Sequence, residues 1–349
     1  MSPSPHFFSF FLVVAASSLA ASSPDATGSY TGCAVTCETL ATKFPNQVYL
    51  GATNGTDFVA SREGFWSTIQ GDVSPYCFFQ PVSATEVSVA LQDVQSTRCQ
   101  FAVKSGGHYS YIASTIEGGL VIDLVRFDGI TLSEDKSLAI VEPGNTWAST
   151  YENLQKSGMT IPGGRIFGVG VGGLTLGGGS SNFGIVTKFK FNTFPQDRMW
   201  YAKLRYNATE NVTANAAFAD WGTVQSSKDV SNAAVLSWNA QASGSPVGVA
   251  ILVHQKTFDN NTHPPVVDKF YDAKPTAIEP ANVPHSDIAE NLLFPASILR
   301  SSLWTTSFIH ADLLQVVFEI WNEEASALAS ISIQQIQLQA ITKSQLELM

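Results

Sequence analysis

Charged residues are scarce in this chain, and the basic ones are the scarcer kind. Asp, Glu, Lys and Arg make up 14% of the 349 residues, and 19 Lys and Arg stand against 29 Asp and Glu, which gives a formal net charge of -10. The sequence contains no run of Lys or Arg. An acidic chain without a basic patch repels a phosphate backbone, so nucleic acid is excluded as a partner.

Long apolar runs are also lacking. The main one, residues 7–16, is followed by small residues and is shorter than the roughly 20 residues that span a bilayer. Its layout is typical of a signal peptide, with a membrane anchor as the alternative. We therefore expect a signal peptide over residues 1–22, a secreted extracellular protein and no membrane partner. In a secreted protein the usable glycan acceptors would be four Asn-x-Ser/Thr sequons, at Asn54, Asn207, Asn211 and Asn260.

Cysteine is rare, and its four copies fall within the first hundred residues. They are Cys33, Cys37, Cys77 and Cys99. An even set in a chain expected to be secreted predicts disulfides. No His lies near Cys33 or Cys37 to complete a zinc site, so we expect no metal. Four cysteines allow three pairings, and we expect Cys37 to pair with Cys99.

Strands and helices alternate over residues 70–200. Ser83 and Glu86 stand at capping-box spacing before a helix predicted over 82–95. A second helix is predicted where Trp147, Tyr151 and Leu154 share one face, with Asn145 or Thr146 as its cap. Strands are predicted at 100–104, 119–124 and 138–144. This alternation predicts an α/β or α+β layer.

After about residue 200 the pattern changes to long strands. These are predicted at 233–241 and 248–255, and a strictly alternating one at 330–339. A helix is predicted over 311–330. Together they indicate an antiparallel sheet with helices on one face, and so a second domain.

Glycine is concentrated in two loops, SGGHYSYIAST at 105–115 and PGGRIFGVGVGGLTLGGG at 162–179. Glycine lets the backbone approach a ligand closely, so that successive N–H groups can bind one anion such as a diphosphate. Gly168, Gly170 and Gly173 match the GxGxxG dinucleotide fingerprint only weakly, because no acid follows at 190–196. An NAD-dependent Rossmann dehydrogenase remains the alternative.

These segments, in their order, resemble the FAD-binding module of the vanillyl-alcohol oxidase superfamily (the PCMH type), in its berberine-bridge-enzyme-like branch. The matching text runs from Pro75 to Trp200 and includes PVSATEV, FAVKSGGHYS, GLVIDL, IPGGR, VGVGGLTLGGG and NFGIVTKF. The resemblance implies an α+β fold with two domains: a PCMH-type FAD-binding domain of mixed α/β subdomains, and an antiparallel-sheet substrate domain with helices on one face. We expect a disulfide-linked segment at 23–70, the FAD-binding domain at 71–200 and the substrate domain at 201–349.

The resemblance also implies which residues contact FAD. In the first loop and beside it these are Lys104, Ser105, Gly106, Gly107, His108, Tyr109 and Ser110. In the second they are Gly163, Gly164, Gly170, Gly172, Gly173, Gly177, Gly178 and Gly179, with Ile185 beyond it. His108 takes the family's role of covalent attachment to the flavin, the alternative being a hydrogen bond to a phosphate. Arg165 either pairs with the diphosphate or is solvated.

The chain departs from the family after Gly179, where a stretch of several tens of residues carrying further flavin contacts is absent, and at its end, where the family's closing segment is absent. We therefore expect an incomplete FAD-binding domain and a truncated substrate domain. No cysteine follows Cys99, which excludes a second covalent flavin linkage. No catalytic base can be named.

The function that follows from the resemblance is that of a monomeric oxidase. It would transfer a hydride from an alcohol, sugar or secondary-metabolite substrate to FAD, which oxygen then reoxidises. The alternative that the departures favour is an inactive remnant or the product of a misread gene.

Overall fold

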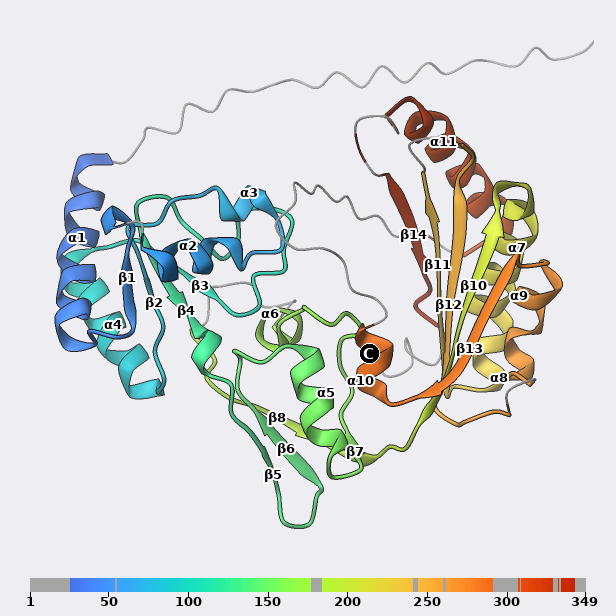
Figure 1. Cartoon of the computed structure of the whole chain (residues 1–349), viewed down its shortest axis with the longest axis horizontal. Helices are drawn as coiled ribbons and strands as arrows, with labels where there is room; N and C mark the ends of the chain where they lie inside the picture. Colours follow the sequence, from blue (N-terminus) through green and yellow to red (C-terminus); the bar gives the residue numbers. More distant parts are fainter. Residues whose placement is uncertain are drawn as a thin grey trace, which may run out of the picture.

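The computed structural model describes residues 26–342 except 54, 177–183, 241–243, 260–261, 291–306, 308, 329–331 and 333. Figure 1 shows two bodies side by side, one built from two small sheets with their helices and the other from a single larger sheet. In the first body helices pack around the two small sheets, whereas in the second most helices lie on one face of the sheet. The predicted α+β fold with two domains is confirmed.

The first subdomain is a four-stranded sheet in the order β1-β2-β4-β3. β2 and β3 both run parallel to β4, whereas β1 is antiparallel to β2. Buried side chains of the sheet pack against helices α1 and α4. The elements are α1 (Ala26–Lys43), β1 (Val48–Leu50), α2 (Thr56–Glu63), α3 (Thr68–Gly71), β2 (Cys77–Phe79), α4 (Ala84–Thr97), β3 (Phe101–Lys104) and β4 (Leu120–Asp123).

Helix α4 forms where the capping-box spacing predicted it. The Ser83 hydroxyl accepts a hydrogen bond from the Glu86 N–H at 3.2 Å. The Glu86 carboxylate in turn accepts one from the Val82 N–H at 2.7 Å. The first bond satisfies an N–H group that a helix start leaves unpaired, and the second ties the helix to the residue before its cap. Val87 and Val94 lie on its buried face.

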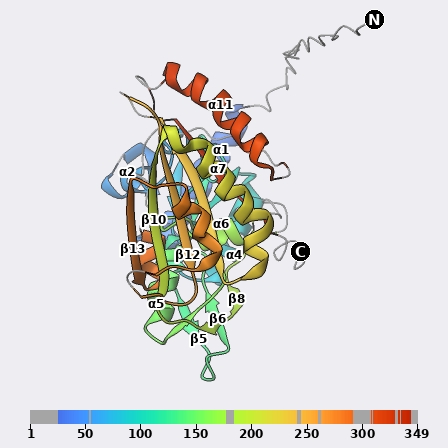
Figure 2. The same cartoon turned by 90° about the vertical axis from the view of Figure 1, so that its right-hand side faces the viewer.

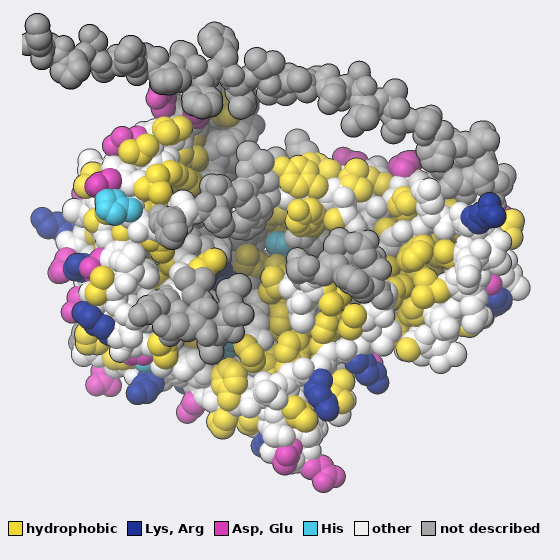
Figure 3. All heavy atoms as spheres, turned by 180° about the vertical axis from the view of Figure 1, so that it is seen from behind, with side chains coloured by type: hydrophobic (Ala, Val, Ile, Leu, Met, Phe, Trp, Pro, Cys, Tyr) yellow, Lys and Arg dark blue, Asp and Glu magenta, His cyan; other side chains and the backbone are white. Residues whose placement is uncertain are grey.

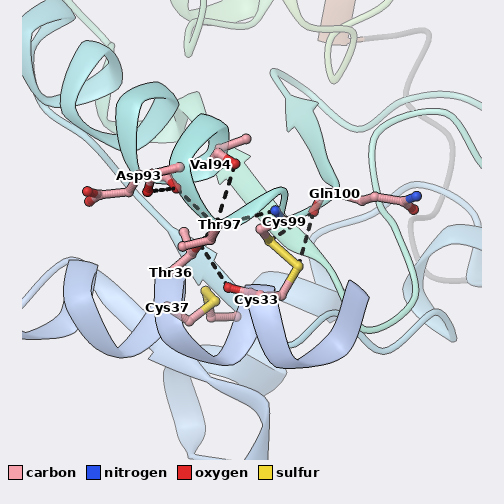
Figure 4. The surroundings of a disulfide bond; sticks show 11 residues. Cys33, Thr36, Cys37, Asp93, Val94, Thr97, Cys99 and Gln100 are labelled. Atoms are coloured by element: carbon pink, nitrogen blue, oxygen red, sulfur yellow. Dashed lines mark hydrogen bonds between the residues drawn. A yellow bond between two sulfur atoms is a disulfide. The ribbon is translucent and has the colours of Figure 1, made fainter. Parts of the chain in front are cut away.

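Two disulfides join α1 to the rest of the subdomain, and their pairing corrects the expected one (Figure 4). Cys33 pairs with Cys99, and Cys37 pairs with Cys77. The expected Cys37–Cys99 bond is wrong. Cys33 and Cys37 lie one turn apart on α1, so each meets a different neighbour. The Cα of Cys33 lies 4.5 Å from that of Cys99, just after α4, while Cys37 faces β2.

The second subdomain is an antiparallel sheet in the order β5-β6-β8, with a two-stranded β7-β9 pair beside it. Helix α5 begins at the predicted cap, since the Thr146 hydroxyl accepts from the Ser149 N–H at 3.2 Å. Its predicted face, Trp147, Tyr151 and Leu154, is buried. The elements are β5 (Ile130–Leu132), β6 (Leu138–Val141), α5 (Trp147–Gln155), β7 (Met159–Thr160), α6 (Val171–Thr175), β8 (Phe189–Asn192) and β9 (Phe194–Pro195).

The second domain is an antiparallel five-stranded sheet in the order β13-β10-β12-β11-β14. Helices cover one face of it (Figures 1 and 2), where Trp200, Leu236 and Trp238 belong to the largest core cluster. Its strands are β10 (Met199–Asn207), β11 (Asn232–Asn239), β12 (Val247–His254), β13 (Ala277–Val283) and β14 (Gln335–Gln339). Its helices are α7 (Asn211–Asp220), α8 (Ser226–Lys228), α9 (Asp268–Asp272), α10 (His285–Glu290) and α11 (Ala311–Leu328), with a π-helical turn at Trp221–Gln225.

The face of this sheet opposite those helices is turned toward the first domain (Figure 1). α10 packs against that face through Ile288, which clusters with Tyr201 and Ile251, and also against α5. α10 therefore bridges the two domains.

No membrane span is found among the described residues, and the face seen in Figure 3 carries no concentrated basic region. Within the described ranges, every helix is too short or too polar to cross a bilayer. On the face in Figure 3, the Lys and Arg side chains are scattered rather than gathered.

Candidate functional site

The two glycine loops meet, backbone against backbone, although they belong to different subdomains. A Cβ atom built on Gly106 would lie 2.5 Å from the backbone nitrogen of Gly170. One built on Gly170 would lie 2.4 Å from the nitrogen of Gly106. Gly172 is similarly close to Ser105, because its Cβ would lie 2.9 Å from the Ser105 hydroxyl. No residue with a side chain fits at Gly106 or Gly170 without moving a loop.

The second loop is held against the start of α5. The Trp147 N–H donates to the Val169 carbonyl at 3.0 Å, and the Val171 N–H donates to the Asn145 carbonyl at 2.9 Å. These two bonds flank the bridge between Thr146 and Gly170. The loop that carries Gly168 and Gly170 is thus fixed by the second subdomain.

The first loop is held by Gln70, a buried residue of α3. Its side-chain NH₂ donates to the Tyr109 carbonyl at 2.8 Å and the Gly107 carbonyl at 3.3 Å. Its side-chain oxygen accepts from the Ser114 N–H at 3.0 Å. The Trp66 N–H also donates to the Gly107 carbonyl. Sequence reasoning missed Gln70, because no local pattern distinguishes a glutamine that binds a distant loop from a solvated one.

Some backbone amides at the contact point of the loops have no acceptor among the described residues. Within the described part of the chain, the N–H groups of Gly106, Gly107, Gly168 and Gly170 donate no hydrogen bond. Gly107 and Gly170 are buried, and a buried amide without an acceptor is costly. Amides of this kind suit the oxygens of an anionic group such as a diphosphate. The residues present therefore fit the FAD that the sequence implied.

His108 lies between the two loops. Its imidazole is half-buried and stacks on the indole of Trp66, with ring centroids 4.4 Å apart and an angle of 19° between the planes. Gly168 of the second loop lies beside it, since a Cβ there would be 3.5 Å from His108 Cδ2. Stacking fixes the ring plane, and the adjacent glycine leaves room for a ligand against the imidazole.

Lys104 is held beneath the first loop by an acid. Its ammonium lies 3.0 Å from the Asp123 carboxylate, with the side chains only 7% and 1% exposed. It also lies 5.3 Å from the ring centroid of Phe65. The charge of Lys104 is already paired, so its visible role is to anchor the end of β3 to β4. The structure brings in Asp123, which the sequence analysis did not single out.

Gly163 and Gly164 lie flat on Trp147. A Cβ on Gly163 would be 2.0 Å from the indole ring, and one on Gly164 would be 2.4 Å from it. The Tyr151 hydroxyl donates to the Gly164 carbonyl at 2.8 Å. Close packing on the Trp147 ring thus explains why both positions require glycine. Arg165, next in the chain, is half-buried without a hydrogen bond or ion pair to any described residue, and burial lowers its pKa.

The remaining expected contacts lie at the edges of this region. Gly172 is buried in the first turn of α6, whereas a Cβ on Gly173 would meet only open space. Tyr109 is exposed beside Tyr111. Ile185 packs on the core of the first subdomain. Ser110 is buried, and its carbonyl accepts from the Ser67 hydroxyl. Gly177, Gly178 and Gly179 lie outside the described residues.

Residues 75–188 match a family model described as an FAD binding domain. Curated fungal proteins are similar over longer stretches. The FAD-dependent monooxygenase tpcD of Cochliobolus heterostrophus is 36% identical over 174 residues, which cover 46% of this chain and 33% of that protein. The FAD-dependent monooxygenase FUP4 of Fusarium proliferatum is 29% identical over 318 residues, covering 74% and 60%. The chain thus spans between one third and three fifths of the length of these two relatives.

Solved structures share the fold at low identity. BBE-like 1 from Physcomitrella patens superposes with a TM-score of 0.59 at 18% identity, covering 75% of this chain and 68% of that one. Phl p 4, a grass pollen allergen with glucose dehydrogenase activity, superposes with a TM-score of 0.64 at 14% identity, covering 89% and 75%. Both domains of the chain therefore have counterparts in known structures.

The glycine loops, the matching family model and the shared fold agree. Residues 75–188 form an FAD binding domain, as the resemblance implied, and the chain shares its fold with a BBE-like protein. The Rossmann alternative is not supported, because a turn rather than a strand precedes Gly168.

Proposed function

We propose that this protein is an FAD-linked oxidase whose flavin is bonded covalently to His108. FAD, when bound, supplies a two-electron acceptor. The overall reaction oxidises a CH–OH group of an alcohol, sugar or secondary metabolite to C=O, and oxygen leaves as hydrogen peroxide. The observation that carries the proposal is a set of amides, at Gly106, Gly107, Gly168 and Gly170, that find no acceptor among the described residues and lie beside the stacked imidazole of His108.

The chain's own residues hold the cofactor in three ways. The four amides bind the diphosphate oxygens through dipoles, which suits a protein of net charge -10 that has few cations to spare. The Gln70 side chain keeps the first loop in place by bonding the carbonyls of Gly107 and Tyr109. Trp66 holds the His108 ring in one plane, which would orient the imidazole for its bond to the methyl carbon of the flavin's benzenoid ring.

The covalent bond is tested by unfolding the purified, flavin-loaded protein in acid. We expect the yellow chromophore to stay with the wild-type chain and to wash away from His108→Ala, which still binds FAD through the amides. His263→Ala is the matched control, because His263 also stacks on an aromatic ring but lies in the second domain. Complete loss of chromophore from the wild type would rule out the covalent bond.

Turnover distinguishes the oxidase from a flavoprotein that binds its cofactor without reacting. The open face of the five-stranded sheet, where Tyr201 and Ile251 lie, is turned toward the FAD-binding domain. A substrate bound against that face would lie between the two domains. We expect peroxide release that depends on substrate when panels of alcohols, sugars and aromatic metabolites are supplied. Flavin that stays oxidised with every substrate class would favour the alternative without turnover.

We also propose that the protein is secreted. The two disulfides support this, because such bonds persist in oxidising compartments. Of the two sequons in the described ranges, Asn207 is exposed, whereas the side-chain oxygen of Asn211 accepts a bond from Gln315. Expression in a fungal host should release the protein into the medium with a glycan at Asn207. Asn207→Gln should remove that glycan, and retention inside the cell would contradict the proposal.

A further inference from the structure

Helix α10 of the second domain docks on α5 of the first through a histidine. The imidazole of His285 stacks on the ring of Tyr151, with centroids 3.9 Å apart and planes at 23°. His285 Nδ1 lies 3.0 Å from the Thr160 hydroxyl, and the Ser286 hydroxyl donates to the Gln155 side chain at 3.0 Å. The contact between α10 and the first domain therefore combines a stacked pair of rings with hydrogen bonds.

The same tyrosine contacts the second glycine loop. Its hydroxyl donates to the Gly164 carbonyl at 2.8 Å. Its ring lies 5.9 Å from that of Trp147, on which Gly163 and Gly164 rest. Tyr151 thus contacts both His285 and the loop; its own side chain is buried, whereas His285 is half-buried.

We infer that Tyr151 and His285 are positioning residues. They couple the docking of α10 on α5, and so of the second domain on the first, to the conformation of the second glycine loop. When α10 is docked, His285 holds the Tyr151 ring, and the Tyr151 hydroxyl holds Gly164. When α10 leaves, that ring is free to turn and the loop loses a support. The structural coupling stands without a cofactor, whereas its effect on FAD rests on the proposed function.

Burial keeps both groups in the forms that this contact requires. It lowers the pKa of His285 to about 4, so a neutral ring stacks at ordinary pH. It raises the pKa of Tyr151 beyond its usual range, so the hydroxyl remains a donor. Two charged residues from the segment before β10, Asp197 and Arg198, line a cavity of about 150 Å³ together with His285. His285→Ala would enlarge that cavity and leave the Tyr151 ring without its neighbour.

Hydrogen exchange of the cofactor-free protein tests the coupling. Within the second loop, the Val169 and Val171 amides are hydrogen bonded to Ile166 and Asn145 and report its opening. We expect His285→Ala to speed exchange in residues 163–171 at least tenfold. Unchanged exchange in a folded His285→Ala protein would overturn the inference.

A second histidine provides the matched control. His263 stacks on Tyr271 at 3.8 Å and 12°, almost the geometry of the stack between α10 and α5, but within the second domain. His263→Ala should leave exchange in 163–171 within twofold of the wild type. An equal acceleration in both variants would mean general loosening and would overturn the inference.

Two milder variants separate the contacts and remain informative if His285→Ala does not fold. His285→Phe keeps a ring against Tyr151 and loses only the bond to Thr160, so the loop should stay protected. Tyr151→Phe keeps the stack and loses the bond to Gly164, so exchange should rise although α10 is docked. The opposite order would overturn the inference.

FAD titration of the same variants separates this inference from the proposed function. Tyr151→Phe should bind FAD several-fold more weakly than the wild type, whereas His263→Ala should bind it equally. If the wild type binds no FAD, the proposed function fails, and the exchange result still decides the coupling.

Discussion

Gly106 rests directly on Gly170, so that two subdomains touch through bare backbone at the centre of the candidate site. In the part of the chain that the structure describes, amides of both loops are left without acceptors at this contact. Gly106→Val should therefore force the loops apart. We expect a loss of about 1 to 3 kcal/mol in unfolding free energy, from overpacking, and loss of FAD binding. Chemical denaturation and FAD titration measure the two effects.

Gly173→Ala should change FAD binding without changing the stability of the protein. A Cβ on Gly173 meets nothing within 4 Å, so the cofactor-free protein should keep its stability within about 0.5 kcal/mol. If Gly173 lines the FAD site, the same methyl group will weaken FAD binding. A variant with reduced stability but unchanged FAD affinity would show that Gly173 has a structural role instead.

The buried Lys104–Asp123 pair should be essential to the cofactor-free fold. Lys104→Met leaves a buried carboxylate uncompensated, which costs about 3 to 5 kcal/mol. Lys43 and Asp93 form an exposed pair at 2.9 Å, and Lys43→Met should cost at most about 1 kcal/mol. Thermal or urea unfolding without FAD compares them. Equal effects would mean that Lys104 is not structural.

Stability should fall in acid because of His285. Its pKa is about 4 in the folded chain, and the ordinary value of 6.5 applies to the unfolded chain. Below pH 6.5 the unfolded chain therefore takes up a proton that the folded chain does not. The free energy of unfolding should fall as pH drops from 6.5 toward 4, by at most about 1.4 kcal/mol per pH unit. Above pH 6.5 the histidine has no effect.

The control for this dependence is His285→Phe, which lacks the titrating group. Only the wild type loses the histidine contribution as the pH falls from 6.5 to 4. If the variant melts at a lower temperature at pH 6.5, the two melting temperatures should therefore converge near pH 4. If the two proteins melt at the same temperature at pH 6.5, their melting temperatures should diverge. Parallel curves between pH 4 and pH 6.5 would contradict the prediction.

The disulfide pairing is open to direct mapping. Peptides from the unreduced protein should be linked as Cys33–Cys99 and Cys37–Cys77. Replacing Cys37 and Cys77 together by serine should cost about 2 to 5 kcal/mol. A Cys37–Cys99 peptide would contradict the structure.

The sequence predicted the parts of this fold that local patterns determine. Helix α4 follows from Ser83 and Glu86, and α5 from its Thr146 cap and aromatic face. The glycine loops were recognisable because glycine density has few other causes. The disulfide pairing was mistaken, because residues one helical turn apart face different neighbours and spacing alone does not reveal them.

The contacts that sequence could not supply are long-range. Gln70 reaches a loop far along the chain, and His285 reaches Tyr151 across a domain boundary. Neither stands in a local motif, since each acts only when tertiary packing brings its partner near. Likewise, Gly163 and Gly164 were expected from the sequence to contact the cofactor, whereas their packing on Trp147 is visible only in three dimensions.

FAD titration of wild type, Gly106→Val and His263→Ala, followed by quenching of flavin fluorescence, tests the central claim most directly. We expect the wild type and His263→Ala to bind one FAD per chain and Gly106→Val to bind none. Equal binding by all three proteins, or no binding by the wild type, would show that the meeting of the two glycine loops does not form the cofactor site.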